Sequence, residues 1–172
     1  MSFNGTRCWF LSIVALLGNL FSASPALGQQ NDGAELEAII HAIAVGWEQA
    51  DGTPFRENFL DFAGARYIES GGQNEGLDDL VEHHVEPEGD SLDGLKLTFS
   101  GIETHVEGDF AWAIADTEVK ATVKSDNRKL HLRGYQTFLF RQTLGQWKVV
   151  HTHSSSRAVR SEPSHKHEDS ED

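Results

Sequence analysis

Cysteine is almost absent from this chain, and its absence excludes several kinds of chemistry. The only thiol among the 172 residues belongs to Cys8. Cys8 lies in the apolar segment 8–21, which is expected to be removed with a leader peptide. The remaining chain then has no thiol nucleophile, no cysteine metal ligand and no disulfide, and this composition suits an oxidising compartment.

Long apolar runs are also scarce, because segment 8–21 is the only one. It follows a short region with one positive charge, Arg7, and precedes a run of small residues that ends at Gly28. This order is typical of a secretory signal peptide over 1–28. The alternative is a membrane anchor, which needs roughly 20 apolar residues. We therefore expect a secreted or periplasmic protein that has no membrane association once the signal is removed.

Motifs for phosphate binding and for serine hydrolysis are missing. The chain has no glycine-rich phosphate loop, no nucleophile elbow and no His-Glu-x-x-His sequence, so nucleotide use and serine hydrolysis are not expected. Positive charge is scarce too, since 14 Lys and Arg stand against 27 Asp and Glu, for a net charge of −13. Nucleic-acid phosphates repel such a chain, so no nucleic-acid partner is expected.

The first half of the remaining chain has helical patterns. After an expected linker over 29–33, apolar residues recur at helical spacing over 34–50. A second helix is expected to begin at Pro54, and a short strand follows over 65–70. Segment 74–84 is expected to form a third helix.

His84 has a distinctive position in this third helix. It continues the stripe of Leu77, Leu80 and Val81 at helical spacing, so it should point toward the buried side of the helix. Its neighbour His83 is rotated about 100° away. Of the two histidines, His84 is therefore the better candidate for an inward role.

The second half alternates between apolar and polar residues, as β-strands do. Before it, the acidic segment 86–90 is expected to be a loop. Four strands joined by short turns are expected over 95–106, 110–123, 129–141 and 147–156. After them we expect a disordered acidic tail with histidines over 159–172. Helices followed by hairpin-linked strands predict an α+β domain over 34–158, in which a strongly curved antiparallel sheet packs against three N-terminal helices as a cone with one pocket.

The last expected strand carries two histidines two residues apart. Because side chains alternate along a strand, His151 and His153 are expected to share a face with Trp147 and Val149. Such a face would suit the floor of a pocket that is apolar at one end and polar at the other. The pattern leaves open whether this face looks into the cone or out of it.

Three segments together resemble a known superfamily. They are Glu69-Ser70-Gly71-Gly72 with Glu75 and then His83-His84, the run Gly108-Asp109-Phe110-Ala111-Trp112, and residues 147–156. In this order, over about 34–158, they are similar to the nuclear transport factor 2-like superfamily, and most to its SnoaL-like branch with its small secreted bacterial members. The resemblance implies a cone-shaped, cystatin-like fold and a homodimer that pairs through the sheet. It leaves the function open, because this fold hosts isomerases, cyclases, dehydratases, binding modules and oligomerisation domains.

One hypothesis is a metal site formed by His84, His151 and His153. Imidazole is the commonest metal ligand at neutral pH, and three of them with an open position would suit zinc or copper. Glu69 or Glu75 could be a fourth ligand or could accept a hydrogen bond from a ring. The alternative is that these are core and rim histidines bonded to backbone or carboxylate groups.

Without a metal, the same histidines suit acid–base catalysis on a small hydrophobic substrate. His151 or His153 would be the base, with Glu69 beside it. Tyr135 or Arg133 would donate a hydrogen bond to a substrate oxygen, unless their face is the solvated back of the sheet. Three hypotheses follow: an exported protein that binds a small molecule or a metal ion in a histidine-lined pocket, an acid–base enzyme of the isomerase, cyclase or dehydratase type, and a dimerisation module without catalysis.

Overall fold

The computed structural model describes residues 25–160. Most of the expected signal peptide, and the tail from residue 161, lie outside the described residues. No helix within the described range has both the length and the apolar character to cross a membrane.

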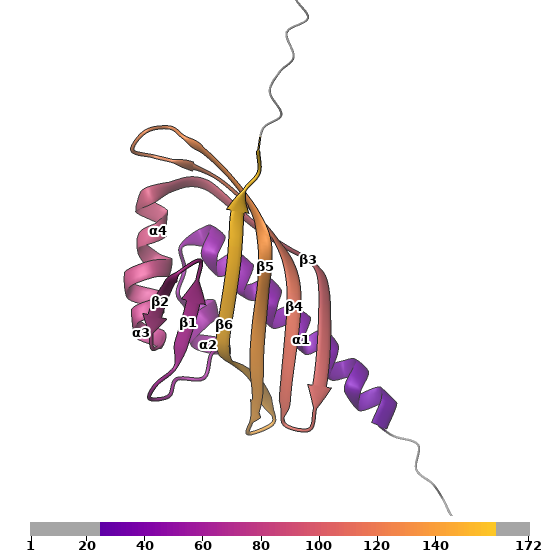
Figure 1. The fold of residues 1–172 in the computed structure, drawn as a ribbon. Coiled ribbons are helices and arrows are strands. Elements are labelled where there is room, and N and C mark those ends of the chain that lie inside the picture. The colour runs from indigo at the N-terminus through magenta and orange to yellow at the C-terminus, as the bar shows by residue number, and fades with distance from the viewer. Residues whose placement is uncertain (1–24, 161–172) are drawn as a thin grey trace, which may run out of the picture.

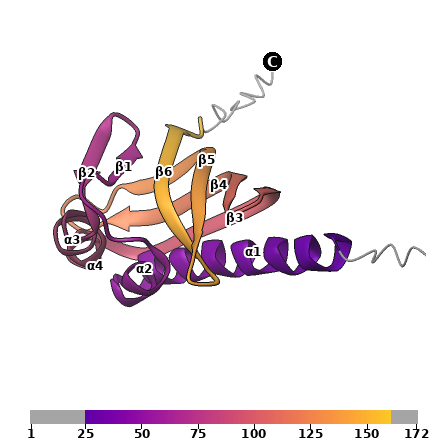
Figure 2. The same cartoon turned by 90° about the horizontal axis from the view of Figure 1, so that it is seen from below.

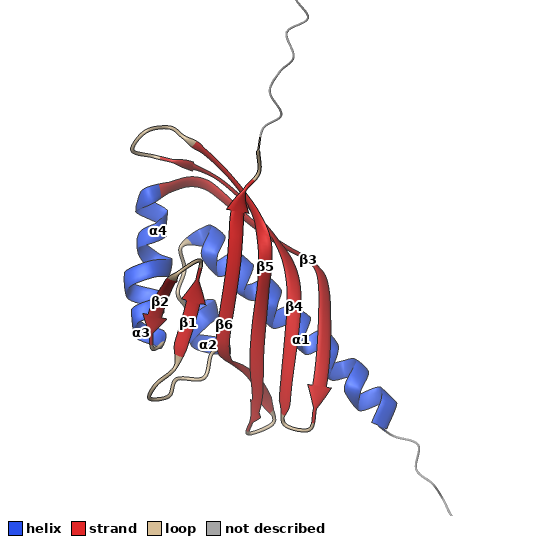
Figure 3. Cartoon of the chain, viewed as in Figure 1, coloured by secondary structure: helices blue, strands red, loops and turns tan. Residues whose placement is uncertain are grey.

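Helices and a small hairpin between the second and third of them come first, and four long strands follow (Figures 1 and 3). The helices are α1 (Pro25–Gln49), α2 (Thr53–Asn58), α3 (Leu77–Leu80), a π-helical turn (Val81–Val85) and α4 (Glu86–Ser91). The strands are β1 (Arg66–Glu69), β2 (Gly72–Glu75), β3 (Leu92–Glu107), β4 (Phe110–Val123), β5 (Lys129–Thr143) and β6 (Gln146–Ala158). The predicted α+β class is confirmed.

The six strands form one sheet in the order β2-β1-β6-β5-β4-β3. The four long strands pair antiparallel, as expected. Strand β1 departs from the prediction, because it lies parallel to β6 and pairs antiparallel only with β2. A parallel pair requires a long crossover, and here the chain from β2 to β5 lies between the two strands.

Strand β3 contains the irregularities that help to curve the sheet. Its pairing with β4 shifts register twice, and a glycine with positive φ stands in each shift: Gly94 at 58° and Gly101 at 57°. Residues other than glycine rarely adopt this backbone conformation. Because an extra residue bends and twists the strand that contains it, the sheet arches over α1 (Figure 2).

The core lies between α1 and the inner face of the sheet. On β4 this face consists of Ala111, Ala113 and Ala115, each with 0% of its surface exposed. Their small side chains leave room for the apolar stripe of α1, in which Leu36 and Ile40 are also fully buried. The predicted helical stripe therefore faces the sheet.

The expected linker over 29–33 is instead part of α1. Polar contacts to β6 hold this part of the helix. Asp32 Oδ1 accepts a hydrogen bond from Trp147 Nε1 at 3.3 Å, and Glu35 Oε1 accepts one from the Trp147 backbone nitrogen at 3.4 Å. These long-range contacts, which local sequence does not reveal, stabilise the helix across Gly33.

The expected loop over 86–90 is also helical, so the helical segment runs from Leu77 to Ser91. Pro87 stands in the first turn of α4 but inside this continuous segment, and it has no N–H to donate to the preceding turn. The π-helical turn before it brings Val81 and Val85 into the core, both with 0% exposure.

Replacing Ala113 by leucine should destabilise the fold, because the larger side chain cannot fit between β4 and α1. We expect the free energy of unfolding to fall by about 1–3 kcal/mol. The neighbouring change Ile114→Leu should alter it by less than about 0.5 kcal/mol, since Ile114 lies on the outer face with 43% of its surface exposed. Urea unfolding of both variants measures the difference, and equal stabilities would contradict the packing described for α1.

Candidate functional site

A cavity of about 530 Å³ lies between the helical segment 77–91 and the inner face of the sheet. Trp47 and leucines from β3 and β5 form its apolar wall, and the polar end is formed by Glu69, Asn74, His84 and Glu88. Its volume and its mixed lining are typical of a site for a small organic molecule.

His84 and Glu69 meet at the polar end of this cavity. The Nε2 atom of His84 lies 3.5 Å from Oε2 of Glu69, and each side chain is one-third exposed. Glu69 reaches the cavity because it stands two residues after the buried Tyr67 on β1, and alternate residues of a strand share a face. The sequence-predicted inward role of His84 agrees with this placement.

Asn74 holds the other side of the His84 ring. Its Nδ2 donates a hydrogen bond to Nδ1 of His84 at 3.1 Å, and only 8% of Asn74 is exposed. Since Nδ1 accepts a hydrogen bond, the ring proton lies on Nε2 and faces Glu69. The ring of Trp47 packs edge-on against the imidazole, with centroids 5.0 Å apart. The orientation and the tautomer of His84 are thus both determined by its neighbours.

The pKa of Glu69 is raised above its ordinary value. Burial of the carboxylate is the main cause, the positive form of His84 acts in the opposite direction, and the negative charge of Glu88 raises the pKa further. A carboxylate with a raised pKa is a stronger base than one in water, provided that it is ionised. Glu69 therefore has the properties of a proton acceptor that faces an apolar cavity.

A β-bulge determines where His151 and His153 lie. His151 pairs with Leu139, whereas Val149 pairs with Phe140, so Val150 is an extra residue in β6. An extra residue reverses the alternation of side chains beyond it. The prediction that the two histidines share a face with Trp147 and Val149 is therefore wrong.

Beyond the bulge, other residues of β6 point inward. Thr152 is buried, and Ser154 and Ser156 line the cavity. His153 is exposed, and the Nδ1–H of His151 donates to the backbone carbonyl of Arg66 at 2.7 Å. The roles expected for the two histidines as bases within the pocket are not compatible with these positions.

The geometry of the predicted three-histidine metal site is likewise absent from residues 25–160. His84 lies in the cavity, while His151 and His153 lie on the other face of the sheet. Within the described part of the chain, no three His, Cys, Asp or Glu side chains are grouped closely enough to hold a metal ion. Glu75 is exposed and forms an ion pair with Arg66 at 3.2 Å.

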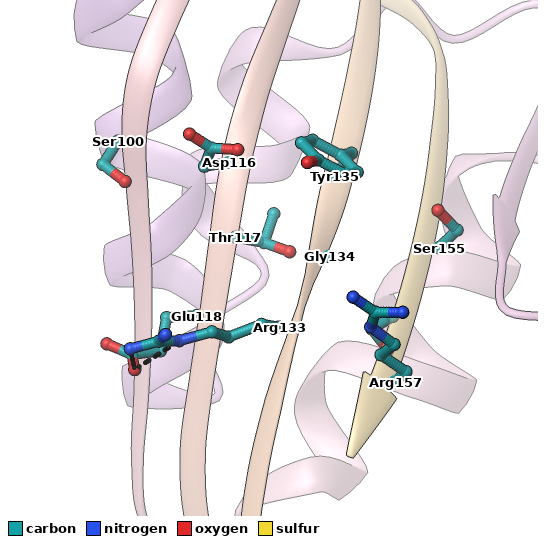
Figure 4. A pocket seen from close by; sticks show the side chains of 10 residues that line it. Ser100, Asp116, Thr117, Glu118, Arg133, Gly134, Tyr135, Ser155 and Arg157 are labelled. Atoms are coloured by element: carbon teal, nitrogen blue, oxygen red, sulfur yellow. Dashed lines mark hydrogen bonds and ion pairs between the residues drawn. The ribbon is translucent and has the colours of Figure 1, made fainter. Parts of the chain in front are cut away.

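Tyr135 and Arg133 lie on the outer face, in a second and shallower depression of about 690 Å³ (Figure 4). Tyr135 is 62% exposed, and Arg133 forms an ion pair with Glu118 at 2.9 Å. Hydrogen bonds from His131, Lys120 and Arg133 lower the pKa of Glu118 to about 2. Because these charges are already paired and exposed to water, the inner cavity is the better candidate site, and Tyr135 does not line it.

Asn74, Trp47 and Glu88 are the site residues that sequence reasoning does not identify. Asn74 resembles a helix cap and Trp47 an ordinary core residue of α1. Glu88 follows a proline in an acidic run, which predicts a loop. The helical spacing of Leu77, Leu80, Val81 and His84 is the only sequence pattern that points to this part of the cavity, and it identifies His84 alone.

The comparisons with known proteins agree with this fold. The model of the SnoaL-like domain matches residues 36–159. No curated protein matches the sequence. Similar solved structures include a nuclear transport factor 2-like superfamily protein from Salmonella enterica serovar Typhimurium, with a TM-score of 0.70, 19% identity, and coverage of 79% of this chain and 98% of that one.

Two further structures are similar at comparable levels. A protein with a cystatin-like fold from Caulobacter vibrioides has a TM-score of 0.60 and 20% identity, with coverage of 73% of this chain and 90% of that one. A type 2 hexachlorocyclohexane dehydrochlorinase has a TM-score of 0.67 and 14% identity, with coverage of 78% and 93%. At these identities the likeness establishes the fold.

The raised pKa of Glu69 can be measured directly. In carbon-detected NMR of glutamate-labelled protein, its carboxyl should titrate above the ordinary value of 4.5. Glu88→Gln should lower this pKa, because the substitution removes a negative charge that disfavours ionisation of Glu69. Glu75→Gln is the matched control and should leave the pKa unchanged. A pKa of 4.5 or lower in the unmodified protein would contradict the environment described here.

Proposed function

Because the chain belongs to the SnoaL-like domain family, we propose that its inner cavity is the active site of an enzyme that transfers protons on a small, largely apolar substrate. The observation that carries the proposal is the contact between His84 and Glu69 at the polar end of this cavity. Glu69 is the proton acceptor, and His84 and Asn74 are positioning residues.

The arrangement supports removal of a proton from carbon. The ionised Glu69 takes the proton, and its raised pKa increases its strength as a base. The Nε2–H of His84 stabilises the carboxylate in one orientation, and the hydrogen bond from Asn74 prevents the ring from turning. Since Nδ1 of His84 is occupied by Asn74, the proton remains on Glu69 until it is returned to the product or to water.

Two reaction types are compatible with this step. The electron pair left on carbon can expel a leaving group from the neighbouring carbon, which is an elimination. It can also move toward an adjacent carbonyl and accept a proton at another carbon, which is an isomerisation. The named reaction of the dehydrochlorinase with a similar fold is an elimination, and this supports the first type.

Binding of a small molecule without catalysis is the second candidate function. The volume of the cavity and its leucine-lined wall favour it as well.

Export and pairing into a homodimer stay predictions. The exposed Ile114 and Tyr135 on the outer face would suit a contact between two sheets.

Glu69→Gln should abolish proton transfer while the fold stays intact. The amide has nearly the same shape but is not a base, so we expect a loss of about 10²–10⁴-fold in rate. Two probes serve for measurement: chloride release from hexachlorocyclohexane, and exchange of the α-protons of 2-tetralone with D₂O, followed by NMR.

Glu75→Gln is the control for this experiment, because Glu75 is a carboxylate on the neighbouring strand whose side chain is exposed and paired with Arg66. It should retain the activity of the unmodified protein. Full activity of the Glu69→Gln variant would contradict the proposed base. Binding of a probe by the unmodified protein without either reaction would support a binding function in place of catalysis.

A further inference from the structure

The charged groups around the inner cavity are unequal in sign. Two carboxylates, Glu69 and Glu88, line it together with the ring of His84. No lysine or arginine is among the described residues that line it. Lys124 borders a smaller adjoining depression and donates a hydrogen bond to the carbonyl of Gly89.

Glu88 is the carboxylate that the proposed reaction does not use. It is half-buried on α4 and lies between the main cavity and the adjoining depression, and Trp47 borders both spaces as well. The Glu69 carboxylate is paired with His84, whereas the Glu88 carboxylate forms no hydrogen bond or ion pair with another side chain within residues 25–160. Its charge is close enough to Glu69 to oppose the ionisation of that group.

Two carboxylates and an indole in the lining of one cavity favour a cation as its ligand. A positive charge in the cavity is attracted by both carboxylates, and an indole attracts a cation that reaches its ring face. A carboxylate or phosphate ligand would instead be repelled by the site and by the net charge of −13 of the chain. The leucines of the apolar wall favour a ligand whose remaining part is apolar.

We propose that the cavity accepts a protonated amine on an apolar ring or chain, with the ammonium group held by Glu88 beside Trp47 and the apolar part against the leucines of β3 and β5. This inference rests on the proposed site, and it names the class of ligand that the site takes. Glu88 is then the residue that determines specificity, while Glu69 remains free to act on the carbon skeleton.

Three probes with one skeleton and different charges test the proposal: 2-aminoindane as the cation, 2-indanol as the neutral molecule and indane-2-carboxylate as the anion. Binding to the full chain is measured by calorimetry at low salt. The amine should bind about tenfold more tightly than the alcohol, and the carboxylate should bind more weakly than either. The preference for the amine should decrease as salt screens the charges.

Glu88→Gln should remove the preference for the amine and leave the affinity for 2-indanol unchanged. Asp90→Asn is the matched control, because it removes the same charge from an exposed position of α4 that does not line the cavity. It should leave all three affinities unchanged.

The proposal is overturned if 2-indanol binds as tightly as the amine, if none of the three probes binds, or if Asp90→Asn has the same effect as Glu88→Gln. These results do not depend on the role of Glu69. If the amine is preferred but the Glu69→Gln variant keeps full activity, the proposed catalysis is refuted and the ligand class is retained. If the amine is not preferred but the Glu69→Gln variant loses activity, the ligand class is refuted and the proposed catalysis is retained.

Discussion

Packing of α1 against the inner face of the curved sheet is the constraint on which the architecture depends. Among the strands α1 lies closest to β3, and the fully buried Ala111, Ala113 and Ala115 of β4 belong to the same core. Further along the same face of β4, Thr117 and Val119 are no longer core residues and line the cavity instead. One face of one strand thus supplies both the core and the site.

The polar end of the cavity depends on the helical segment from Leu77 to Ser91. Its π-helical turn keeps Val81 and Val85 in the core while His84 points toward Glu69, and π-helical turns are frequent at functional sites. Asn74, on the opposite side of the ring, contacts Nδ1 and fixes the orientation of the imidazole. The candidate base is therefore positioned by three consecutive elements of the chain: β1, β2 and the helical segment that follows them.

Carboxylates on the two sides of the sheet have different electrostatic surroundings. On the outer face Glu118 is surrounded by His131, Lys120 and Arg133, so its negative charge is compensated. In the cavity beneath the inner face, no lysine or arginine is among the described residues that line it beside Glu69 and Glu88. A negative charge beside apolar surface costs free energy when it has no partner, and a ligand that supplies a positive charge to Glu88 would offset this cost.

The sequence by itself determined the order of the elements, the α+β class and the inward position of His84. These properties follow from local periodicity, because the residues that form a buried helical stripe or an alternating strand lie near one another in the sequence. Only the tertiary structure decided which face of β6 looks inward. The bulge at Val150 reverses the alternation, and no residue type in Val149-Val150-His151 signals it. The helical course through Pro87 and the meeting of Glu69, Asn74 and Glu88 around one cavity were decided in the same way, since contacts between different elements leave no periodic pattern in the sequence.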